Sequence, residues 1–136
     1  MTTRLNPYLT FDGDARQAME FYQSVFGGQL RISTFGEFGT SDPAVADKVM
    51  HALLNTDRGY TLMAADTAPG MPYQPGSTMT CSLSGDPEEG LAEAWERLSD
   101  GGTVRVPFEK QMWGDLYGMC VDRFGVPWMV NVVQSQ

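Results

Sequence analysis

The sequence is poor in histidine, cysteine and basic residues, and each shortage argues against a class of function. His51 is the single histidine, and the two cysteines, Cys81 and Cys120, show neither a CxxC pair nor metal-ligand spacing. Nine basic residues against 17 acidic ones give a net charge of −8, which opposes binding to nucleic-acid phosphates. Neither a bilayer-spanning apolar run of about 18 residues nor a signal peptide is evident. We therefore expect a cytoplasmic protein with no nucleic-acid or membrane partner, whose cysteines are small core residues.

What the chain does contain is a large share of soft and aromatic side chains. It has nine methionines, seven phenylalanines, five tyrosines and three tryptophans in 136 residues. Such side chains fill cores, and they also line adaptable apolar cavities. A chain of this length is predicted to form one domain with a sizeable core.

The sequence also repeats itself. "FGGQLR" begins at Phe26 and "DGGTVR" begins at Asp100, so the two Gly-Gly pairs lie 74 positions apart. The Gly-Asp pairs that begin at Gly13 and Gly85 lie 72 positions apart. We interpret the pattern as one module present twice, with a two-residue insertion in the second copy.

Each copy predicts an amphipathic helix with start and stop signals. Asp14, with Gln17 three residues later, has the pattern of a capping box. Asp86 and Glu89 repeat that pattern in the second copy. A Gly-Gly pair ends each predicted helix. Gly90 lies inside the second helix, where glycine costs about 1 kcal/mol relative to alanine.

A strand is predicted before each helix, at Tyr8–Phe11 and at Thr78–Ser84. Side chains alternate along both strands, so that the apolar face is expected to meet the helix and the other, open face to look into whatever the sheet encloses. Superposing the copies by 72 positions places Leu9 on Cys81. The residues of the first strand that are predicted to line the open face are Tyr8 and Thr10.

The remaining elements complete the order βαβββ in each copy. Further strands are predicted at 29–35 and 103–109, and hairpins at 49–66 and 116–132, which turn at 57–59 and 122–125. A short helix is predicted in "SDPAVADK", with Asp42 as its cap. The predicted fold class is α+β, with a first module at about 1–67, a proline-rich connector at 68–76 and a second module at about 77–136.

Three stretches of this sequence resemble a known family. "YLTFDGDARQAMEFYQSVFGG", "VMHALL" with "LMAAD", and "WGDLYGMCVDRFGVPWMV" are similar to the PhnB-like branch of the vicinal oxygen chelate superfamily, which includes glyoxalases, extradiol dioxygenases and bleomycin- or fosfomycin-resistance proteins. The resemblance implies two curved mixed sheets around a cavity (the glyoxalase/bleomycin resistance fold) and a homodimer. Some members of this branch are named demethylubiquinone methyltransferases. The one glycine-rich turn here, "GEFG" at Gly36, precedes no convincing long helix, so a nucleotide-like methyl donor is not predicted.

The resemblance also implies where a metal would be bound. Metal-dependent relatives hold a divalent ion with His, Gln or Glu side chains on the first and fourth strands of each module, because such an ion needs oxygen or nitrogen ligands. The first-strand positions fall at 6–8 and 78–80, and the fourth-strand positions fall on Met63 and Met129. A thioether is a poor ligand for these ions. We therefore predict no metal and no cofactor; the alternative is a divalent metal held by ligands that the sequence does not reveal.

Other residues have both a functional and a structural interpretation. His51 is the candidate for acid–base catalysis, because imidazole is the side chain most often used for it, or it is simply hydrogen-bonded near a strand start. Trp113 and Tyr117 form the wall of a ligand pocket, or they pack on the core as part of a hairpin turn. Asp66 is interpreted as a loop cap and Trp128 as a core residue.

The leading hypothesis is a metal-free protein that binds a small molecule in its cavity. The alternatives are a divalent-metal-dependent lyase, isomerase or dioxygenase, a protein that sequesters a cationic or aromatic antibiotic, and metal-free catalysis with His51 as the base. The residues predicted to line the cavity are Tyr8, Thr10, Met63, Thr80, Trp113, Tyr117 and Met129.

Overall fold

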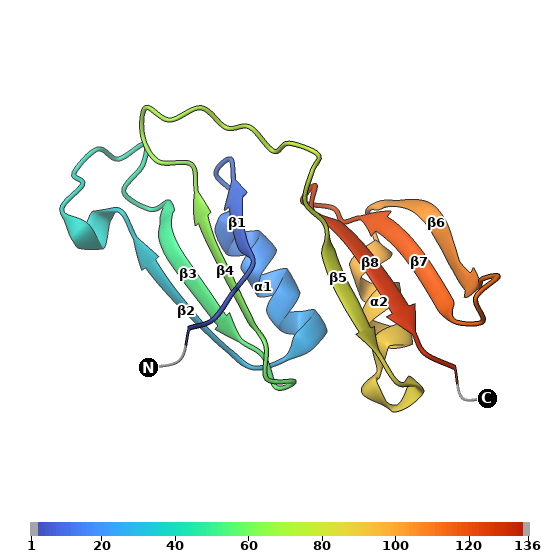
Figure 1. Ribbon diagram of the computed structural model, residues 1–136. Helices are drawn as coiled ribbons and strands as arrows, with labels where there is room; N and C mark the ends of the chain where they lie inside the picture. Colours follow the sequence, from blue (N-terminus) through green and yellow to red (C-terminus); the bar gives the residue numbers. More distant parts are fainter. Residues whose placement is uncertain (1–2, 135–136) are drawn as a thin grey trace. The chain divides into compact units, whose positions relative to one another are not determined.

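The computed structural model describes residues 3–134 and separates into two compact units, one ending at Pro75 and the other beginning at Gly76. Each unit contains a four-stranded mixed sheet with one α-helix along one of its faces (Figure 1). The predicted α+β class and the βαβββ order of both modules are confirmed. None of the helices in the described part of the chain has the length and apolarity needed to cross a bilayer.

The two sheets have the same topology. The first module contains β1 (Tyr8–Phe11), α1 (Ala15–Phe26), β2 (Gln29–Thr34), the 3-10 helix η1 (Gly36–Phe38), β3 (Val49–Asn55) and β4 (Thr61–Asp66). The second contains β5 (Cys81–Gly85), the 3-10 helix η2 (Pro87–Glu89), α2 (Leu91–Ser99), β6 (Thr103–Lys110), β7 (Leu116–Val121) and β8 (Pro127–Val132). The strand orders are β1-β4-β3-β2 and β5-β8-β7-β6. In each sheet the first and fourth strands of the module pair in parallel and the other pairs are antiparallel.

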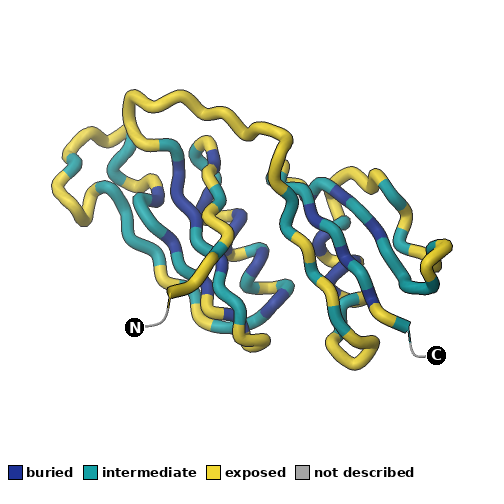
Figure 2. Tube along the Cα trace, viewed as in Figure 1, coloured by how far each residue is buried: buried dark blue, intermediate teal, exposed yellow. Residues whose placement is uncertain are grey.

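A separate core lies between each helix and its sheet. Buried and less buried residues alternate along the central strands, as expected when only one sheet face is covered (Figure 2). Phe11 is buried on the helix side of β1, as predicted, whereas Tyr8 and Thr10 on the other face are exposed. In the second module Trp95 of α2 lies directly over Gly118 of β7, where an added Cβ would come within 2.8 Å of the indole ring. The largest buried side chains are Trp128, Tyr22, Phe11, Met19, Leu54 and Leu98.

A close approach of two backbone segments explains why the Gly-Gly pair occurs twice. Gly27 and Gly28 have φ angles of 72° and 101°, in the left-handed region that favours glycine. A Cβ on Gly28 would overlap the carbonyl oxygen of Asn55, and one on Gly102 would overlap that of Val121. In both modules the second glycine therefore lets the chain leave the helix and pass directly against the hairpin that follows.

The register of the sheets corrects the predicted alignment of the modules. Tyr8 pairs with Met63, and Ser82 pairs with Met129. Tyr8 is therefore equivalent to Ser82, 74 positions later, and not to Thr80 as the 72-position superposition predicts. The Gly-Gly pairs have the same spacing of 74, so no insertion separates the copies at this point. The two Gly-Asp pairs are a similarity of sequence that is not matched in the structure.

The start of α1 is capped by a residue that is distant in sequence. Asp14 makes no side-chain hydrogen bond to the helix, so the predicted capping box is wrong. Instead Oδ1 of Asp66, at the end of β4, accepts hydrogen bonds from the backbone N–H groups of Gly13 and Ala15, both at 2.9 Å. Its Oδ2 accepts a third from Val49 N–H at 2.8 Å. The loop-cap interpretation of Asp66 is therefore too narrow, because one buried carboxylate joins α1, β3 and β4.

The start of α2 also differs from the prediction. Asp86 makes no side-chain cap, and Gly90 has a φ of 73°, which ends η2 and starts α2 as a separate element. Gly90 therefore lies before the first residue of α2, and not inside the helix as the sequence predicted. The preceding strand begins at Cys81 rather than Thr78, and Leu9 superposes on Leu83 rather than on Cys81.

The connection between β2 and β3 contains no helix at "SDPAVADK". Residues 43–47 form turns, within which the Ala44 N–H donates to the Asp42 carboxylate at 3.0 Å. Asp42 thus caps a turn that does not continue. The short helix in this connection is instead η1, which the sequence did not predict.

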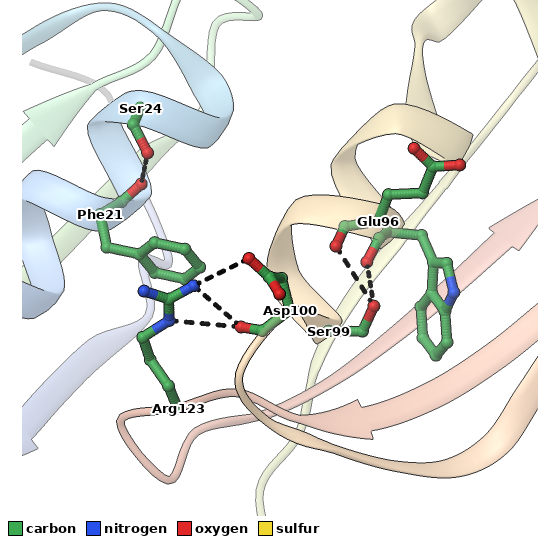
Figure 3. Close-up of polar contacts among 7 residues, drawn as sticks. Phe21, Ser24, Glu96, Ser99, Asp100 and Arg123 are labelled. Atoms are coloured by element: carbon green, nitrogen blue, oxygen red, sulfur yellow. Dashed lines mark hydrogen bonds and ion pairs between the residues drawn. The ribbon is translucent and has the colours of Figure 1, made fainter.

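The β7–β8 turn is tied to the end of α2. Arg123 donates hydrogen bonds to the backbone carbonyl of Asp100, from Nε at 3.2 Å and from Nη2 at 3.0 Å, and its Nη2 forms an ion pair with the Asp100 carboxylate at 3.3 Å (Figure 3). The Ser99 hydroxyl donates back to the carbonyl of Trp95 at 2.8 Å. These contacts hold the end of α2 against the β7–β8 hairpin. In the first module the side chain of Asp57 occupies the equivalent place, beside Gly27.

Candidate functional site

The helix-free face of the first sheet carries the predicted residues of the first module. Strand register aligns Tyr8, Met63, Leu53 and Arg31 in one row across β1, β4, β3 and β2. Tyr8 is 52% exposed, and the side chain of Met63 at the centre of the row is half-buried. The row therefore combines an apolar centre with a phenol at one edge and a guanidinium at the other.

Tyr8 and His51, which the sequence did not connect, lie together on this face. The Tyr8 hydroxyl is 3.4 Å from Nδ1 of His51, and the two ring centroids are 5.8 Å apart. Because β4 lies between β1 and β3, the Tyr8 ring must extend across β4 to reach the imidazole. On this face β4 carries Ala65, which pairs with Thr10 in register and has only a methyl side chain. The pair of Tyr8 and His51 places a hydroxyl and an imidazole on this face beside Met63.

The helix-free face of the second sheet repeats the methionine but changes its neighbours. Met129 lies between Ser82 and Met119, as Met63 lies between Tyr8 and Leu53. Thr80 lies just before the start of β5 and does not pair with Met129. Ser82, which the sequence analysis missed, occupies that position, and correct superposition on the Gly-Gly spacing would have found it.

Trp113 and Tyr117 lie together at the end of this second face. Their rings meet edge to face, with centroids 5.6 Å apart. The Trp113 indole N–H is 3.4 Å from Oδ1 of Asn131, whose Nδ2 donates to Asp115 at 3.0 Å. We name Trp113, Tyr117, Asn131 and Asp115 the aromatic corner. Sequence analysis found the two aromatic residues but missed the two polar ones. Asn131 lies two residues after Met129 in β8 and therefore on the same face of the sheet.

The residues at the metal positions do not fit a divalent cation. Met63 and Met129 offer thioethers, and Tyr8 and Ser82 offer neutral hydroxyl groups. Within residues 3–134, no three His, Cys, Asp or Glu side chains gather closely enough to hold a metal ion. Mg²⁺, Mn²⁺ and Zn²⁺ bind carboxylate, imidazole or thiolate ligands, none of which stands at these positions.

The strand-to-helix turn of the first module is also unsuited to a phosphate or nucleotide-like group. Such a group binds the free N–H groups at a helix N-terminus. Here the N–H groups of Gly13 and Ala15 already donate to Asp66. The turn at Gly36 leads only into the three-residue helix η1 and not into a long helix.

Neither cysteine is activated as a nucleophile. Cys81 and Cys120 both pair with Trp128, from opposite sides, so the central strand β8 separates the two thiols. Burial, with a smaller contribution from the Asp122 charge, raises the pKa of each thiol to about 11. The thiols therefore stay protonated at neutral pH, where only the thiolate would react.

A separate hollow of about 390 Å³ lies between the N-terminal segment and the β3–β4 turn. Its lining residues are Arg4, Leu5, Asn6, Pro7, Gly59, Tyr60 and Thr61. Burial raises the pKa of the Tyr60 hydroxyl to about 12 against the opposing effect of Arg58, so this group is a neutral donor. The hollow includes Asn6 and Pro7 from the first metal position but none of the residues predicted to line the cavity.

The sequence matches a described family over most of its length. The profile of the family described as 3-demethylubiquinone-9 3-methyltransferase matches residues 3–131. Protein YjdN of Escherichia coli is 30% identical over 145 residues, covering 97% of both chains. An uncharacterized protein of Mycobacterium bovis, Mb0911c, is 34% identical over 134 residues, which cover 93% of this chain and 81% of that one.

Solved structures share the fold. The protein PA1353 from Pseudomonas aeruginosa has a TM-score of 0.88 at 35% identity and covers 98% of this chain and 100% of its own. The PhnB protein from Bacillus cereus has a TM-score of 0.78 at 23% identity, covering 96% and 100%. A glyoxylase/bleomycin resistance protein/dioxygenase domain from Frankia has a TM-score of 0.65 at 14% identity, covering 98% and 99%, a likeness of fold alone.

Proposed function

Because this chain belongs to the PhnB-like family, whose profile is described as 3-demethylubiquinone-9 3-methyltransferase, and has the glyoxalase/bleomycin resistance/dioxygenase fold, we propose that it binds a small molecule on the helix-free faces of its sheets without a metal. The observation that carries this proposal is the pair of methionines at equivalent positions, Met63 and Met129, each at the centre of such a face. Thioether side chains adapt to the shape of an apolar ligand but ligate hard cations poorly.

The surroundings of each methionine support ligand binding over simple packing. Ligand sites combine an apolar floor with a few placed polar groups. On the first face, Tyr8 and His51 supply such groups beside Met63. On the second, Ser82 lies beside Met129, and the aromatic corner lies one row away, since Asn131 and Tyr117 pair with each other. The proposal includes no methyl transfer, because the Gly13 and Ala15 N–H groups at the start of α1 already donate to Asp66.

The ligand proposal is tested by thermal shift with a library of small apolar and aromatic compounds. A ligand of the native state raises the Tm. We expect some compounds to raise the Tm of the wild-type protein, and Met63→Gln or Met129→Gln to lower that increase, because glutamine keeps the side-chain length but removes the apolar character. Met112→Gln is the matched control, since Met112 is fully exposed in the β6–β7 turn. A uniform response of all four proteins would contradict the proposal.

A metal analysis of the purified protein tests the proposal that the small molecule is bound without a metal. We expect far less than one equivalent of Ni, Mn, Fe or Zn per chain. A stoichiometric metal would favour the alternative of a metal-dependent lyase, isomerase or dioxygenase with other ligands.

One observation favours a second function, metal-free acid–base catalysis. The Tyr8 hydroxyl beside Nδ1 of His51 can fix the orientation of the imidazole, which leaves Nε2 to exchange a proton with a bound molecule. Once a substrate is found, we expect His51→Ala to lower kcat much more than KM. Unchanged kcat in that variant would reject catalysis and leave binding in place.

The proposal extends to assembly, location and partners. We propose a homodimer in the cytoplasm, with a small molecule as the partner and with no nucleic acid. The unpaired cysteines are consistent with a reducing compartment, and the net charge of −8 disfavours nucleic acid. Sedimentation analysis is expected to give twice the chain mass of 15.0 kDa. A single species at the chain mass would reject the dimer.

A further inference from the structure

The aromatic corner exposes a large aromatic surface that the second module leaves uncovered. Trp113 is 61% exposed, whereas Trp95 and Trp128 are only 8% and 1% exposed. The edge-to-face contact with Tyr117 and the indole N–H contact with Asn131 hold Trp113 on the helix-free side of the sheet. The planes of the two rings lie at 65° to each other in this contact.

Carboxylates give the aromatic corner a negative charge. Within residues 3–134 the Asp115 carboxylate accepts hydrogen bonds only from neutral groups, Asn131 Nδ2 at 3.0 Å and Gln134 N–H at 3.3 Å, so its charge is oriented without being neutralised. No ion pair joins Asp115 to a cation within residues 3–134. Glu109 pairs with Tyr117 in register and therefore lies on the same side of the sheet, whereas Lys110 points to the other side.

Aromatic faces bounded by carboxylates favour a particular class of ligand. The negative face of an aromatic ring attracts cations, and weakly hydrated quaternary ammonium groups gain most because they lose little solvation. We propose that the aromatic corner binds the N-methylated ammonium group of a small organic cation. This inference rests on the proposed small-molecule function, and it adds the ligand class and the module that recognises it.

Choline and its neutral carbon analogue 3,3-dimethylbutan-1-ol provide a matched test, because they differ in charge and hardly in shape. The readout is the indole N–H resonance of Trp113 in an NMR titration, assigned by its loss in Trp113→Phe. We expect choline to shift this resonance with an affinity about tenfold higher than the neutral alcohol, a preference in the range of a partly desolvated cation–π contact. The resonances of the buried Trp95 and Trp128 are expected to move little.

Charge variants separate attraction from packing. Glu109→Gln and Asp115→Asn are expected to weaken choline binding about threefold to tenfold and to leave binding of the neutral alcohol unchanged. Glu88→Gln is the matched control, because Glu88 lies in the exposed η2 turn on a different element. Raising the NaCl concentration from 50 mM to 500 mM should weaken choline binding in the wild-type protein more than in Glu109→Gln. The Tm of each variant shows whether it is folded, and Glu109→Gln keeps the test valid if Asp115→Asn loosens the hairpin.

Two outcomes would overturn the inference. Equal affinity for choline and the neutral alcohol would show that the corner is an apolar site without charge selection, and the proposed small-molecule function would stand. No shift of the Trp113 resonance with either compound would reject the corner as a ligand site. The proposed function would then be judged by the thermal-shift experiment alone, which tests binding at Met63 and Met129 independently of the aromatic corner.

Discussion

At the scale of single residues, the second glycine of each Gly-Gly pair and Asp66 make contacts with segments that are distant in sequence. The second glycine of each Gly-Gly pair touches the backbone of a hairpin that lies about twenty to thirty residues along the chain. Asp66 joins the start of α1 to β3 through three backbone hydrogen bonds. In both cases the residue type follows from a partner that no local pattern identifies.

Replacing Gly28 is expected to destabilise the first module strongly. Gly28→Ala introduces a Cβ that overlaps the Asn55 carbonyl, and it does so at a φ of 101°. The free energy of unfolding should fall by about 3 kcal/mol. Gly59→Ala is the control, because Gly59 has a similar φ of 87° but open space around it, and it should lose only about 1 kcal/mol. Equal losses in urea unfolding would show that the close approach is unimportant.

Asp66 is expected to contribute more than an ordinary cap. Asp66→Asn replaces the acceptor of one bonded N–H group by a donor and removes the charge that strengthens the other bonds. We expect a loss of about 2–4 kcal/mol in urea unfolding. Asp42→Asn, at an exposed turn with one such hydrogen bond, should lose less than about 1 kcal/mol. A comparable loss at both positions would contradict this role.

At the scale of elements, local patterns predicted the elements well and their alignment less well. The alternation in "YLTF" and the Gly-Gly pair after Phe26 depend on neighbouring residues, and β1 and the end of α1 are where they indicate. The equivalence of Tyr8 and Ser82 depends on pairing with β4 and β8, which the sequence does not encode locally. For the same reason Tyr8 and His51 were each noted as candidates, yet their contact was not foreseen, and Asp115 and Asn131 were missed.

The position of Gly90 between η2 and α2 reverses the expected effect on stability of replacing it by alanine. Inside a helix, replacing glycine by alanine would stabilise the protein by about 1 kcal/mol. Because Gly90 has a φ of 73°, Gly90→Ala is instead expected to destabilise it by about 1 kcal/mol. Thermal unfolding monitored by circular dichroism gives the sign directly. An increase in Tm would mean that η2 and α2 form one continuous helix in solution.

At the scale of the whole molecule, the chain consists of two units with separate cores and different polar networks. Asp66 serves the first unit, and in the second the equivalent position is Val132. Asp122 serves the second unit, where it accepts hydrogen bonds from Phe124 N–H, Val126 N–H and the Trp128 indole. The two units therefore have similar backbones that are stabilised by carboxylates at different positions. We expect the stability of each unit to respond differently to solution conditions.

The second unit is expected to set the alkaline limit of stability. The pKa of Cys81 and of Cys120 is about 11 in the folded chain against 9.0 for a free thiol, so the folded state holds these protons more tightly. The resulting stabilisation is complete below pH 9 and is lost as the pH rises from about 9 to 11. Urea unfolding between pH 8 and pH 11 should show this decline. A Cys81→Ala, Cys120→Ala double variant should decline less, and an identical profile would reject the assignment.

The segment between the units is expected to be the first site of proteolysis. Residues 67–80 contain no helix or strand and are mostly exposed (Figure 2). Limited digestion with chymotrypsin should cut first at Tyr73, which is 37% exposed in this segment, and give two fragments that mass spectrometry identifies. Tyr73→Ser should slow the cut. A first cut at Phe38 or Trp113 would show that the segment is protected in solution.

The register has a consequence for how the two modules differ. Equivalent residues are 74 positions apart up to the starts of the second strands, Gln29 and Thr103, and 66 positions apart at the ends of the third strands, Asn55 and Val121. The main difference in length lies in the connection between the second and third strands, which has 14 residues in the first module, Phe35 to Lys48, and five in the second, the turn that contains Trp113. The chain can be regarded as one scaffold used with two interchangeable loops. Exchanging those loops would be expected to move ligand preference from one module to the other while each sheet keeps its own core.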